Sequence, residues 1–300
     1  MITPRVGFIG TGLIGTPMVE RLLERELSVT VWNRTAAKLS PLVDAGAFAA
    51  SSPPSLVGQT DIVCLCLTDT NAVHEVMFGA TGIAPHMRAD QVLVDFSSIA
   101  PDGTVTMAAK LRDLSSVGWI DAPVSGGLPA ARAGRLIIFA GGDASDITRA
   151  TPVFDALSMR VTHMGGQGAG QLAKTCNQMI VACNNLVIAE MLAFAAKAGI
   201  DADRLPDALA GGFADSLPLQ IFGRRMARHI TTPKIGAIAT FRKDIQQAAR
   251  LAKEHGAFAP MTTRAAELYR AAAERDDVGA DADIARIIHM FEQLQNASHT

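Results

Sequence analysis

The chain has 300 residues, of which 49% are hydrophobic and 19% are charged, and its formal net charge is −2. This length suffices for two domains, and the composition is that of a globular protein rather than a disordered or fibrous one. The small net charge and the lack of a Lys/Arg run argue against a nucleic-acid partner, but one or two local cations would still bind a small anionic substrate.

The first feature along the chain is a short apolar run that ends in spaced glycines, RVGFIGTGLIG at residues 5–15. It predicts a strand, a tight turn and a helix start, the geometry that places a dinucleotide pyrophosphate on a helix N-terminus. Gly10 permits the turn, Gly12 lets the backbone approach the phosphates, and Gly15 lets the helix pack closely on the strand. The residues expected to bind the cofactor here are Gly10, Thr11, Gly12, Leu13, Ile14 and Gly15.

Strands and helices alternate through the first half of the chain. Apolar, β-branched runs predict strands, and longer amphipathic stretches predict helices between them. The predicted strands after the first are 28–32, 61–67, 92–96, 119–124, 136–140 and 160–163, and the predicted helices are 17–26, 36–45, 71–78 and 101–114. This alternation favours an α/β fold with a Rossmann-type doubly wound sheet, mixed in its later strands.

The pattern changes at the glycine-rich stretch GGQGAG, residues 165–170, after which no strand is predicted. A long apolar helix is expected over 171–198, which joins the two domains. The further predicted helices are 203–210, 217–229, 238–255, 260–274 and 281–295. We therefore expect a nucleotide-binding domain at residues 1–164 and an all-helical domain for substrate binding and oligomerisation at 165–300.

Three residues at the end of the second strand bear on the choice of cofactor. An NAD site usually has an acidic residue there, about 20 residues after the glycine turn. This chain instead has Asn33, Arg34 and Thr35, and a guanidinium with a hydroxyl suits a 2′-phosphate. We expect NADP(H), with use of NAD(H) left open, and a solvated surface Arg34 is the alternative.

Two further stretches carry polar groups suited to a small acid. Ser125, Gly126 and Gly127 end the segment DAPVSGG, where consecutive glycines let backbone N–H groups converge on an anion such as a carboxylate. Taken by itself, an ordinary loop is the alternative interpretation of this segment. Lys174 lies early in the long helix, with Asn177 and Gln178 on the same helix face. A lysine near a helix N-terminus and a cationic nicotinamide gives up its proton more readily, which suits a general acid/base.

Five stretches in the same order together resemble the β-hydroxyacid dehydrogenase family over nearly the whole chain. They are GFIGTGLIGTPM, DFSSIAP, DAPVSGG, GAGQLAKTCNQM and FRKD. The resemblance implies an NAD(P)-dependent enzyme that interconverts a small 3-hydroxy acid and its 3-oxo acid or semialdehyde. It also implies a homodimer or homotetramer in which the long helix is shared.

The same resemblance implies roles for individual residues. Lys174 would be the catalytic acid/base, and Ser125 to Gly127 would hold the substrate carboxylate with help from Asn177. Gln178 departs from the Asn-Asn pair of 3-hydroxyisobutyrate dehydrogenases and is similar to the residue of 2-hydroxy-3-oxopropionate reductases. The remaining residues implied at the cofactor are Leu67, Thr68, Ser98 and Lys243.

Two other functions stay open at this point. Imine reduction occurs in relatives of this architecture, which typically replace the lysine, and a non-catalytic dinucleotide-binding module is the third possibility. The histidines lie scattered, so neither a histidine base nor a metal site is expected. They are His74, His86, His163, His229, His255, His289 and His299.

The expected location is a reducing cytoplasm. We expect no secretory signal, because the residues before the first strand contain no basic region or long apolar stretch. Asn184 and Glu190 interrupt the most apolar stretch, residues 179–196, which we interpret as a helix buried between domains or subunits rather than a membrane span. Cys64 and Cys66 alternate along a strand and are expected in the core. The four cysteines, without metal or disulfide spacing, are Cys64, Cys66, Cys176 and Cys183.

Overall fold

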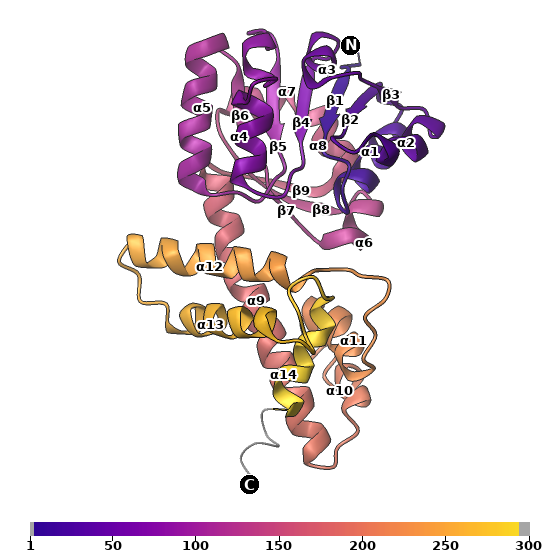
Figure 1. Ribbon diagram of the computed structural model, residues 1–300, viewed down its shortest axis with the longest axis vertical. Coiled ribbons are helices and arrows are strands. Elements are labelled where there is room, and N and C mark those ends of the chain that lie inside the picture. The colour runs from indigo at the N-terminus through magenta and orange to yellow at the C-terminus, as the bar shows by residue number, and fades with distance from the viewer. Residues whose placement is uncertain (1–2, 294–300) are drawn as a thin grey trace. The chain divides into compact units, whose positions relative to one another are not determined.

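The computed structural model describes residues 3–293 (Figure 1). The chain forms two compact units, Met1–Lys174 and Thr175–Thr300. The first contains a nine-stranded sheet with helices, and the second is built from helices. The helix α9 (Ala169–Lys197) begins in the first unit and continues into the second.

The sheet begins with six parallel strands in the order β3-β2-β1-β4-β5-β6, which is the order of a doubly wound dinucleotide-binding fold. A second, mixed part follows, in which β8 runs antiparallel to β6 and β7 and parallel to β9. The α/β fold and its mixed later part are thereby confirmed. The strands are β1 (Val6–Ile9), β2 (Val29–Trp32), β3 (Phe48–Ala49), β4 (Ile62–Leu65), β5 (Val92–Asp95), β6 (Gly118–Asp121), β7 (Val124–Ser125), β8 (Leu136–Gly141) and β9 (Ser158–Gly165).

Both faces of the inner parallel strands β1, β4 and β5 are buried, which explains their continuous apolar sequences, whereas the edge strand β3 is exposed. Successive side chains point to opposite faces, so Phe8 and Cys64 belong to one core cluster and Ile9 and Leu65 to the other. Cys66 packs against the cluster that contains Cys64, so the prediction that both cysteines pack on one side of the sheet is confirmed. Burial raises the pKa of both thiols, and all four cysteines of the chain are free.

The helices of the first unit pack on the two faces of the sheet (Figure 1). They are α1 (Gly15–Glu24), α2 (Ser40–Asp44), α3 (Pro53–Gly58), α4 (Thr70–Phe78), α5 (Pro101–Ser115), α6 (Gly127–Arg132), α7 (Ala144–Arg149) and α8 (Thr151–Leu157). The prediction of one helix over 36–45 is wrong. A 3₁₀ turn at Ala36–Lys38 precedes α2, because Pro41 has no amide hydrogen and favours the first turn of a new helix.

The second unit packs its helices around an apolar core that includes the buried Tyr269, whose ring stacks on Phe241 at 6.1 Å between centroids. The α9 side of this core includes Ala182, Ala189 and Leu192. After α9, the helices are α10 (Leu205–Ala208), α11 (Arg224–Ala227), α12 (Ile238–Glu254), α13 (Pro260–Glu274) and α14 (Ile288–Gln293).

Three helices predicted for this unit are shorter than expected. The stretch 203–210 contains a 3₁₀ turn and then α10, since Pro206 starts a new helix. The stretch 217–229 contains a π-helical turn at Leu219–Gly223 before α11. Over 281–295, the Asp283 carboxylate caps a 3₁₀ turn at Ile284–Ile287 that leads into α14, and residues 294–295 lie outside the described part of the chain.

Among the described residues, one helix is long and apolar enough to cross a membrane. This is α9, and 44% of its most apolar 18-residue window is buried inside the protein. A helix that contributes to a hydrophobic core passes the same test of length and composition, and α9 does contribute to one.

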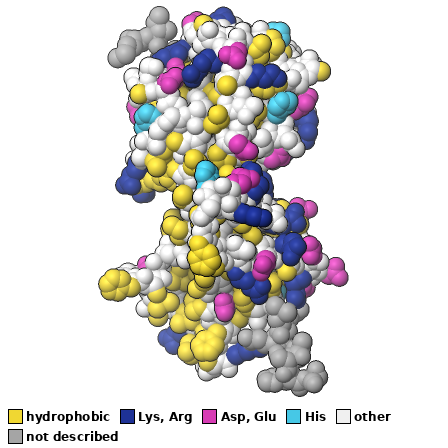
Figure 2. All heavy atoms as spheres, turned by 90° about the vertical axis from the view of Figure 1, so that its left-hand side faces the viewer, with side chains coloured by type: hydrophobic (Ala, Val, Ile, Leu, Met, Phe, Trp, Pro, Cys, Tyr) yellow, Lys and Arg dark blue, Asp and Glu magenta, His cyan; other side chains and the backbone are white. Residues whose placement is uncertain are grey.

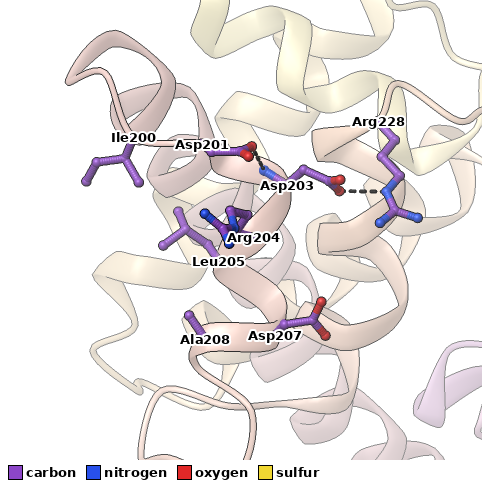
Figure 3. A pocket seen from close by; sticks show the side chains of 8 residues that line it. All are labelled: Ile200, Asp201, Asp203, Arg204, Leu205, Asp207, Ala208 and Arg228. Atoms are coloured by element: carbon purple, nitrogen blue, oxygen red, sulfur yellow. Dashed lines mark hydrogen bonds and ion pairs between the residues drawn. The ribbon is translucent and has the colours of Figure 1, made fainter.

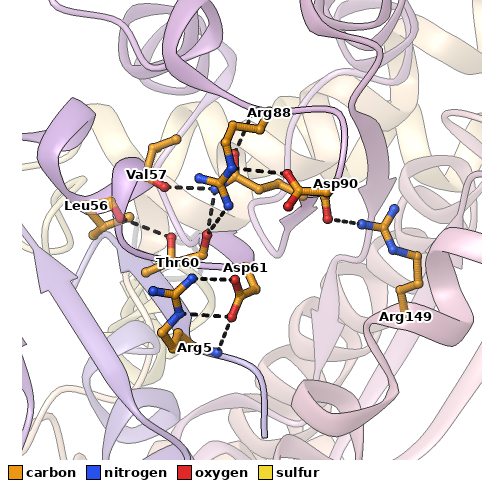
Figure 4. Close-up of polar contacts among 9 residues, drawn as sticks. Arg5, Leu56, Val57, Thr60, Asp61, Arg88, Asp90 and Arg149 are labelled. Carbon is orange, nitrogen blue, oxygen red and sulfur yellow. Dashed lines mark hydrogen bonds and ion pairs between the residues drawn. The ribbon is translucent and has the colours of Figure 1, made fainter. Parts of the chain in front are cut away.

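Polar contacts join the beginnings of the parallel strands (Figure 4). The Arg5 guanidinium hydrogen-bonds the Asp61 carboxylate at 2.8 Å and lowers its pKa. The buried Gln91 amide donates to the carbonyl oxygens of Val57 (2.8 Å) and Thr60 (2.7 Å). These contacts fix the amino ends of β1, β4 and β5, so the opposite, carboxyl ends are left for a ligand.

Candidate active site

The glycine turn has the shape that a dinucleotide requires. Gly10 has a φ of +103°, and a Cβ there would lie 2.3 Å from the Cys66 carbonyl oxygen. A Cβ at Gly15 would lie 2.0 Å from the Gly10 carbonyl oxygen, so helix α1 packs tightly on the turn. By contrast, a Cβ at Gly12 would meet nothing within 4 Å among the described residues. The turn is therefore closed at its ends and open at Gly12, which fits a pyrophosphate.

The Asn33 side chain connects the end of β2 to this turn. Its amide donates to the Thr11 hydroxyl at 2.7 Å, and its carbonyl oxygen accepts from the Thr35 backbone N–H at 3.2 Å. Arg34 and Thr35 are exposed beside it. Asn33 and Arg34 also line a surface hollow of about 590 Å³. Asn33 thus supports the turn, while Arg34 faces solvent next to it.

The other predicted cofactor residues lie after β4 and β5. The Leu67 N–H donates to the Ser97 hydroxyl at 2.9 Å, which ties the two strand ends together next to Ser98. The Thr68 hydroxyl donates to the Asp69 carboxylate at 2.8 Å. Since β4 is the neighbour of β1, these residues lie at the same edge of the sheet as the glycine turn, where doubly wound sheets bind ligands.

Two buried carboxylates that the sequence analysis did not single out end adjacent strands. Asp95 and Asp121 are register partners in β5 and β6, and both are fully buried. Burial raises the pKa of Asp95 to about 7, and one of its oxygens has no hydrogen-bond partner among residues 3–293. Burial also raises the pKa of Asp121, but backbone N–H groups of Gly168 and Gln171 oppose this by stabilising the ionised form.

The segment Ser125–Gly127 has the backbone conformation expected of an anion-binding loop. Gly126 and Gly127 have φ values of +120° and +63°, a region that favours glycine. A Cβ at Gly126 would also lie 2.5 Å from the Ala130 Cβ. Ser125 ends β7, and Gly127 begins α6, so the loop leads directly into a helix. Gly126 and Gly127 thus lie at a short strand-to-helix turn, a backbone arrangement that suits an anion.

A polar chain connects the remaining predicted residues within the second unit. Asn177 donates to the Gln178 carbonyl oxygen at 2.8 Å, and Gln178 donates to the Asp244 carboxylate at 2.6 Å. The Lys243 ammonium lies 3.4 Å from the other Asp244 oxygen. Asp244, 7% exposed, is the central member, and the motif FRKD contains it although the sequence analysis assigned it no role. Lys174 precedes this chain on α9, one turn before Asn177 and Gln178.

Other polar features of the second unit involve none of the predicted site residues. Figure 3 shows a hollow of about 740 Å³ near α10, where the Arg228 guanidinium donates to the Asp203 carboxylate at 2.6 Å. His229 lies 3.6 Å from the Glu292 carboxylate, and its ring lies 5.5 Å from that of His289. The structure thus brings together two histidines that the sequence separates, and His299 lies outside the described residues.

Two family models match the chain. Residues 5–166 match the NAD-binding domain of 6-phosphogluconate dehydrogenase. Residues 168–291 match the NAD-binding model of NADP-dependent 3-hydroxyisobutyrate dehydrogenase. The second match includes the whole of α9, so this long apolar helix belongs to the region that the family model describes.

Individual proteins agree with these matches. The 2-hydroxy-3-oxopropionate reductase of Escherichia coli (strain K12) is 36% identical over 294 residues, which cover 97% of this chain and 98% of the reductase. The crystal structure of 3-hydroxyisobutyrate dehydrogenase from Salmonella typhimurium has a TM-score of 0.88 and 27% identity, covering 96% of this chain and 99% of that one. An imine reductase from Streptomyces aurantiacus shares the fold alone, with a TM-score of 0.65 and 20% identity over 96% of this chain and 100% of that one.

The glycine turn, the strand order and these matches lead to one conclusion. The family models cover both units, and the E. coli reductase aligns over almost its full length. The chain belongs to the β-hydroxyacid dehydrogenase family and is an NAD(P)-dependent oxidoreductase that acts on hydroxy acids.

Proposed function

We propose that this enzyme interconverts 2-hydroxy-3-oxopropionate, or a 3-hydroxy acid of similar size such as 3-hydroxyisobutyrate, with its redox partner, and that Lys174 is its general acid/base. The observation that carries the proposal is the place of Lys174 at the end of the compact unit that also holds the glycine turn and the Ser125 loop. The 36% identity with the E. coli reductase and the Gln178 side chain favour the 3-oxo acid over 3-hydroxyisobutyrate.

In this proposal the chain's own residues bind the acid and move one proton. Ser125, Gly126 and Gly127 hold the substrate carboxylate, which sets the distance from this anchor to the reacting carbon. Asn177 and Gln178 contact the substrate hydroxyl side. The neutral Lys174 amine accepts the hydroxyl proton during oxidation, and its ammonium returns a proton to the carbonyl oxygen during reduction. When bound, the nicotinamide accepts or supplies the hydride.

The cofactor in this proposal is NADP(H). Gly12 leaves room for the pyrophosphate, and the exposed Arg34 with Thr35 suits the 2′-phosphate through charge-assisted hydrogen bonds. Leu67, Thr68 and Ser98 contact the cofactor from the ends of β4 and β5. Lys243, which lies beside Asp244, is the last proposed cofactor residue.

The enzyme is proposed to act as a homodimer or homotetramer in the cytoplasm. Along α9, Ile180, Val187 and Phe194 are 67%, 53% and 66% exposed, and their seven-residue spacing places them in one stripe. Figure 2 shows further hydrophobic side chains gathered on the helical unit. An exposed apolar stripe of this kind is suited to a second copy of the chain. Light scattering after size-exclusion chromatography measures the assembly directly.

A panel of substrates tests the proposed reaction. Oxidation of NADPH and NADH is followed with 2-hydroxy-3-oxopropionate, succinic semialdehyde and glyoxylate, and the reverse reaction with 3-hydroxyisobutyrate, L-serine and 4-hydroxybutyrate. The highest kcat/KM is expected for 2-hydroxy-3-oxopropionate with NADPH. Turnover of cyclic imines without turnover of any of these acids would instead favour imine reduction, and cofactor binding without any turnover would favour a non-catalytic module.

A further inference from the structure

The first turn of α9 is attached to the loop that follows β5. The Gln171 side-chain amide donates to the Ser97 carbonyl oxygen at 2.8 Å, and its carbonyl oxygen accepts from the Ile99 N–H at 3.2 Å. Gln171 is only 1% exposed, so water does not compete for these bonds. The two backbone groups flank Ser98, one of the proposed cofactor residues. A single side chain thus fixes the helix to both sides of that residue.

The same turn is attached to the end of β6 by a buried carboxylate. Asp121 accepts from the Gly168 N–H at 2.8 Å, the Gln171 N–H at 3.0 Å and the Gln167 side-chain amide at 3.2 Å. The first N–H groups of a helix lack partners within it and carry partial positive charge, so a carboxylate satisfies and stabilises them. The cap position before α9 is Gly168, which has no side chain, and the acceptor comes from Asp121, 47 residues earlier.

Close packing adds a steric constraint to these bonds. A Cβ at Gly170 would lie 2.4 Å from the Phe139 carbonyl oxygen and 2.5 Å from the Asp121 carbonyl oxygen. The first turn of α9 therefore rests directly on the backbones of β6 and β8. A helix held by hydrogen bonds and by backbone contact has little freedom to tilt.

We propose that Asp121 and Gln171 are positioning residues, which together fix the first turn of α9 and so place Lys174 relative to the Ser98 and Ser125 segments. This inference rests on the proposed role of Lys174. Lys174 follows Gln171 by three residues, a rise of about 4.5 Å along the helix. A tilt of the first turn is therefore passed on to the Lys174 side chain, and a misplacement of about 1 Å can lower a catalytic rate about 100-fold.

Capping a helix with a buried carboxylate costs free energy, because the carboxylate loses its hydration. This cost argues that Asp121 serves more than stability. Asp121 is buried beside Asp95, and two negative charges that are close together and shielded from water repel each other. A serine or asparagine immediately before the helix would satisfy the same N–H groups at lower cost. A local cap, however, would not attach the helix to the end of β6, whereas Asp121 does.

Two substitutions test the inference in the full-length enzyme. Asp121→Asn retains the side-chain shape but turns an N–H₂ group toward a backbone N–H, and Gln171→Met removes both bonds to the Ser98 segment. The matched control is Asp95→Asn, an isosteric change at the register partner of Asp121; the Asp95 carboxylate accepts from the Ser97 N–H. If Asp121→Asn does not fold, Gln171→Met alone still tests the inference. The measurements are steady-state kinetics, NADPH affinity, the primary deuterium isotope effect on kcat, and amide hydrogen exchange over residues 168–174.

For both test variants we expect kcat to fall about 10- to 100-fold, with NADPH affinity within about threefold of wild type. The isotope effect should rise, because poor placement of Lys174 slows the chemical step, whereas partial unfolding would lower kcat without changing it. Amide exchange over 168–174 should accelerate in the test variants and not in Asp95→Asn.

Unchanged exchange, or faster exchange with unchanged kcat and isotope effect, would overturn the positioning role. The proposed function fails separately. If Lys174→Ala retains wild-type turnover while Asp121→Asn still accelerates exchange, the helix anchor stands and the assignment of Lys174 falls.

Discussion

At the scale of single residues, Arg34 carries the expected preference for NADP(H). We expect Arg34→Ala to raise KM for NADPH about 10- to 100-fold, because a charge-assisted hydrogen bond to the 2′-phosphate is lost, and to leave KM for NADH within about twofold. Steady-state kinetics with both cofactors measure the difference. Arg25→Ala, at an exposed arginine just after α1, is the control. An equal change for both cofactors would show that Arg34 does not contact the phosphate.

A second residue-scale prediction concerns the dependence of stability on pH. The pKa of Asp95 is raised from 3.8 to about 7 in the folded protein, so the folded state binds a proton that the unfolded state has lost between these values. This contribution makes stability fall as pH rises from about 4 to about 7, by up to about 4 kcal/mol. Asp95→Asn cannot ionise, and we expect it to remove this loss.

Thermal denaturation at pH 5 and pH 8 measures the effect of Asp95→Asn. The variant should melt higher than wild type at pH 8, while the two proteins should differ much less at pH 5. A variant less stable than wild type at pH 8 would show that the Asp95 carboxylate is ionised and well solvated in the folded protein.

Residue pairs far apart in sequence set a limit on what the sequence predicts. The roles of Asn33, Asp121 and Gln171 come from hydrogen bonds to partners 22, 46–50 and 72–74 positions away. No local pattern marks such pairs. The glycines of the turn could be predicted, because the strand, turn and helix that require them follow one another in the sequence. The proposed role of Lys174 rests on its motif and on its place at the end of the first unit.

At the scale of elements, a substitution in the turn between β1 and α1 should weaken cofactor binding without affecting folding. A Cβ at Gly12 meets nothing within 4 Å, so Gly12→Val should fold with the stability of wild type. Its side chain would occupy the space proposed for the pyrophosphate, so NADPH affinity should fall at least about 100-fold. Circular dichroism melts and fluorescence titration with NADPH give the two quantities.

Gly10→Ala is the matched variant in the same turn. Its Cβ would meet the Cys66 carbonyl oxygen at 2.3 Å with φ at +103°, so this change should lower stability itself. Wild-type NADPH affinity in Gly12→Val would contradict the placement of the cofactor at this turn.

The elements that the sequence predicted are the long or strongly apolar ones. Strands β1, β4 and β5 are buried throughout and β2 is buried up to Trp32, while α12 and α13 have clear amphipathic periods, so the positions of these elements follow from local pattern. The short helices α3, α6, α7 and α8 were missed, since six or seven residues give too little periodicity. Proline explains why two predicted helices are divided. Pro41 and Pro206 have no amide hydrogen to continue the preceding turn, and each lies in the first turn of a new helix.

At the scale of the whole molecule, the two units carry different parts of the proposed site. The first unit carries the glycine turn, the strand ends, the Ser125 loop and Lys174, while the second carries the polar chain of Asn177, Gln178, Asp244 and Lys243. The α/β fold was predictable because its strands alternate with helices and because one turn has a specific glycine spacing. The exact substrate depends on side chains that the sequence pattern does not place.

The most direct measurement of the central claim is the turnover of Lys174→Met with 2-hydroxy-3-oxopropionate and NADPH. Lys197→Met, at the exposed end of the same helix, is the control. Loss of the acid/base should lower kcat about 100- to 10,000-fold, while NADPH affinity and melting temperature stay at wild-type values. Turnover within a few fold of wild type, in a folded variant that binds NADPH, would contradict the account.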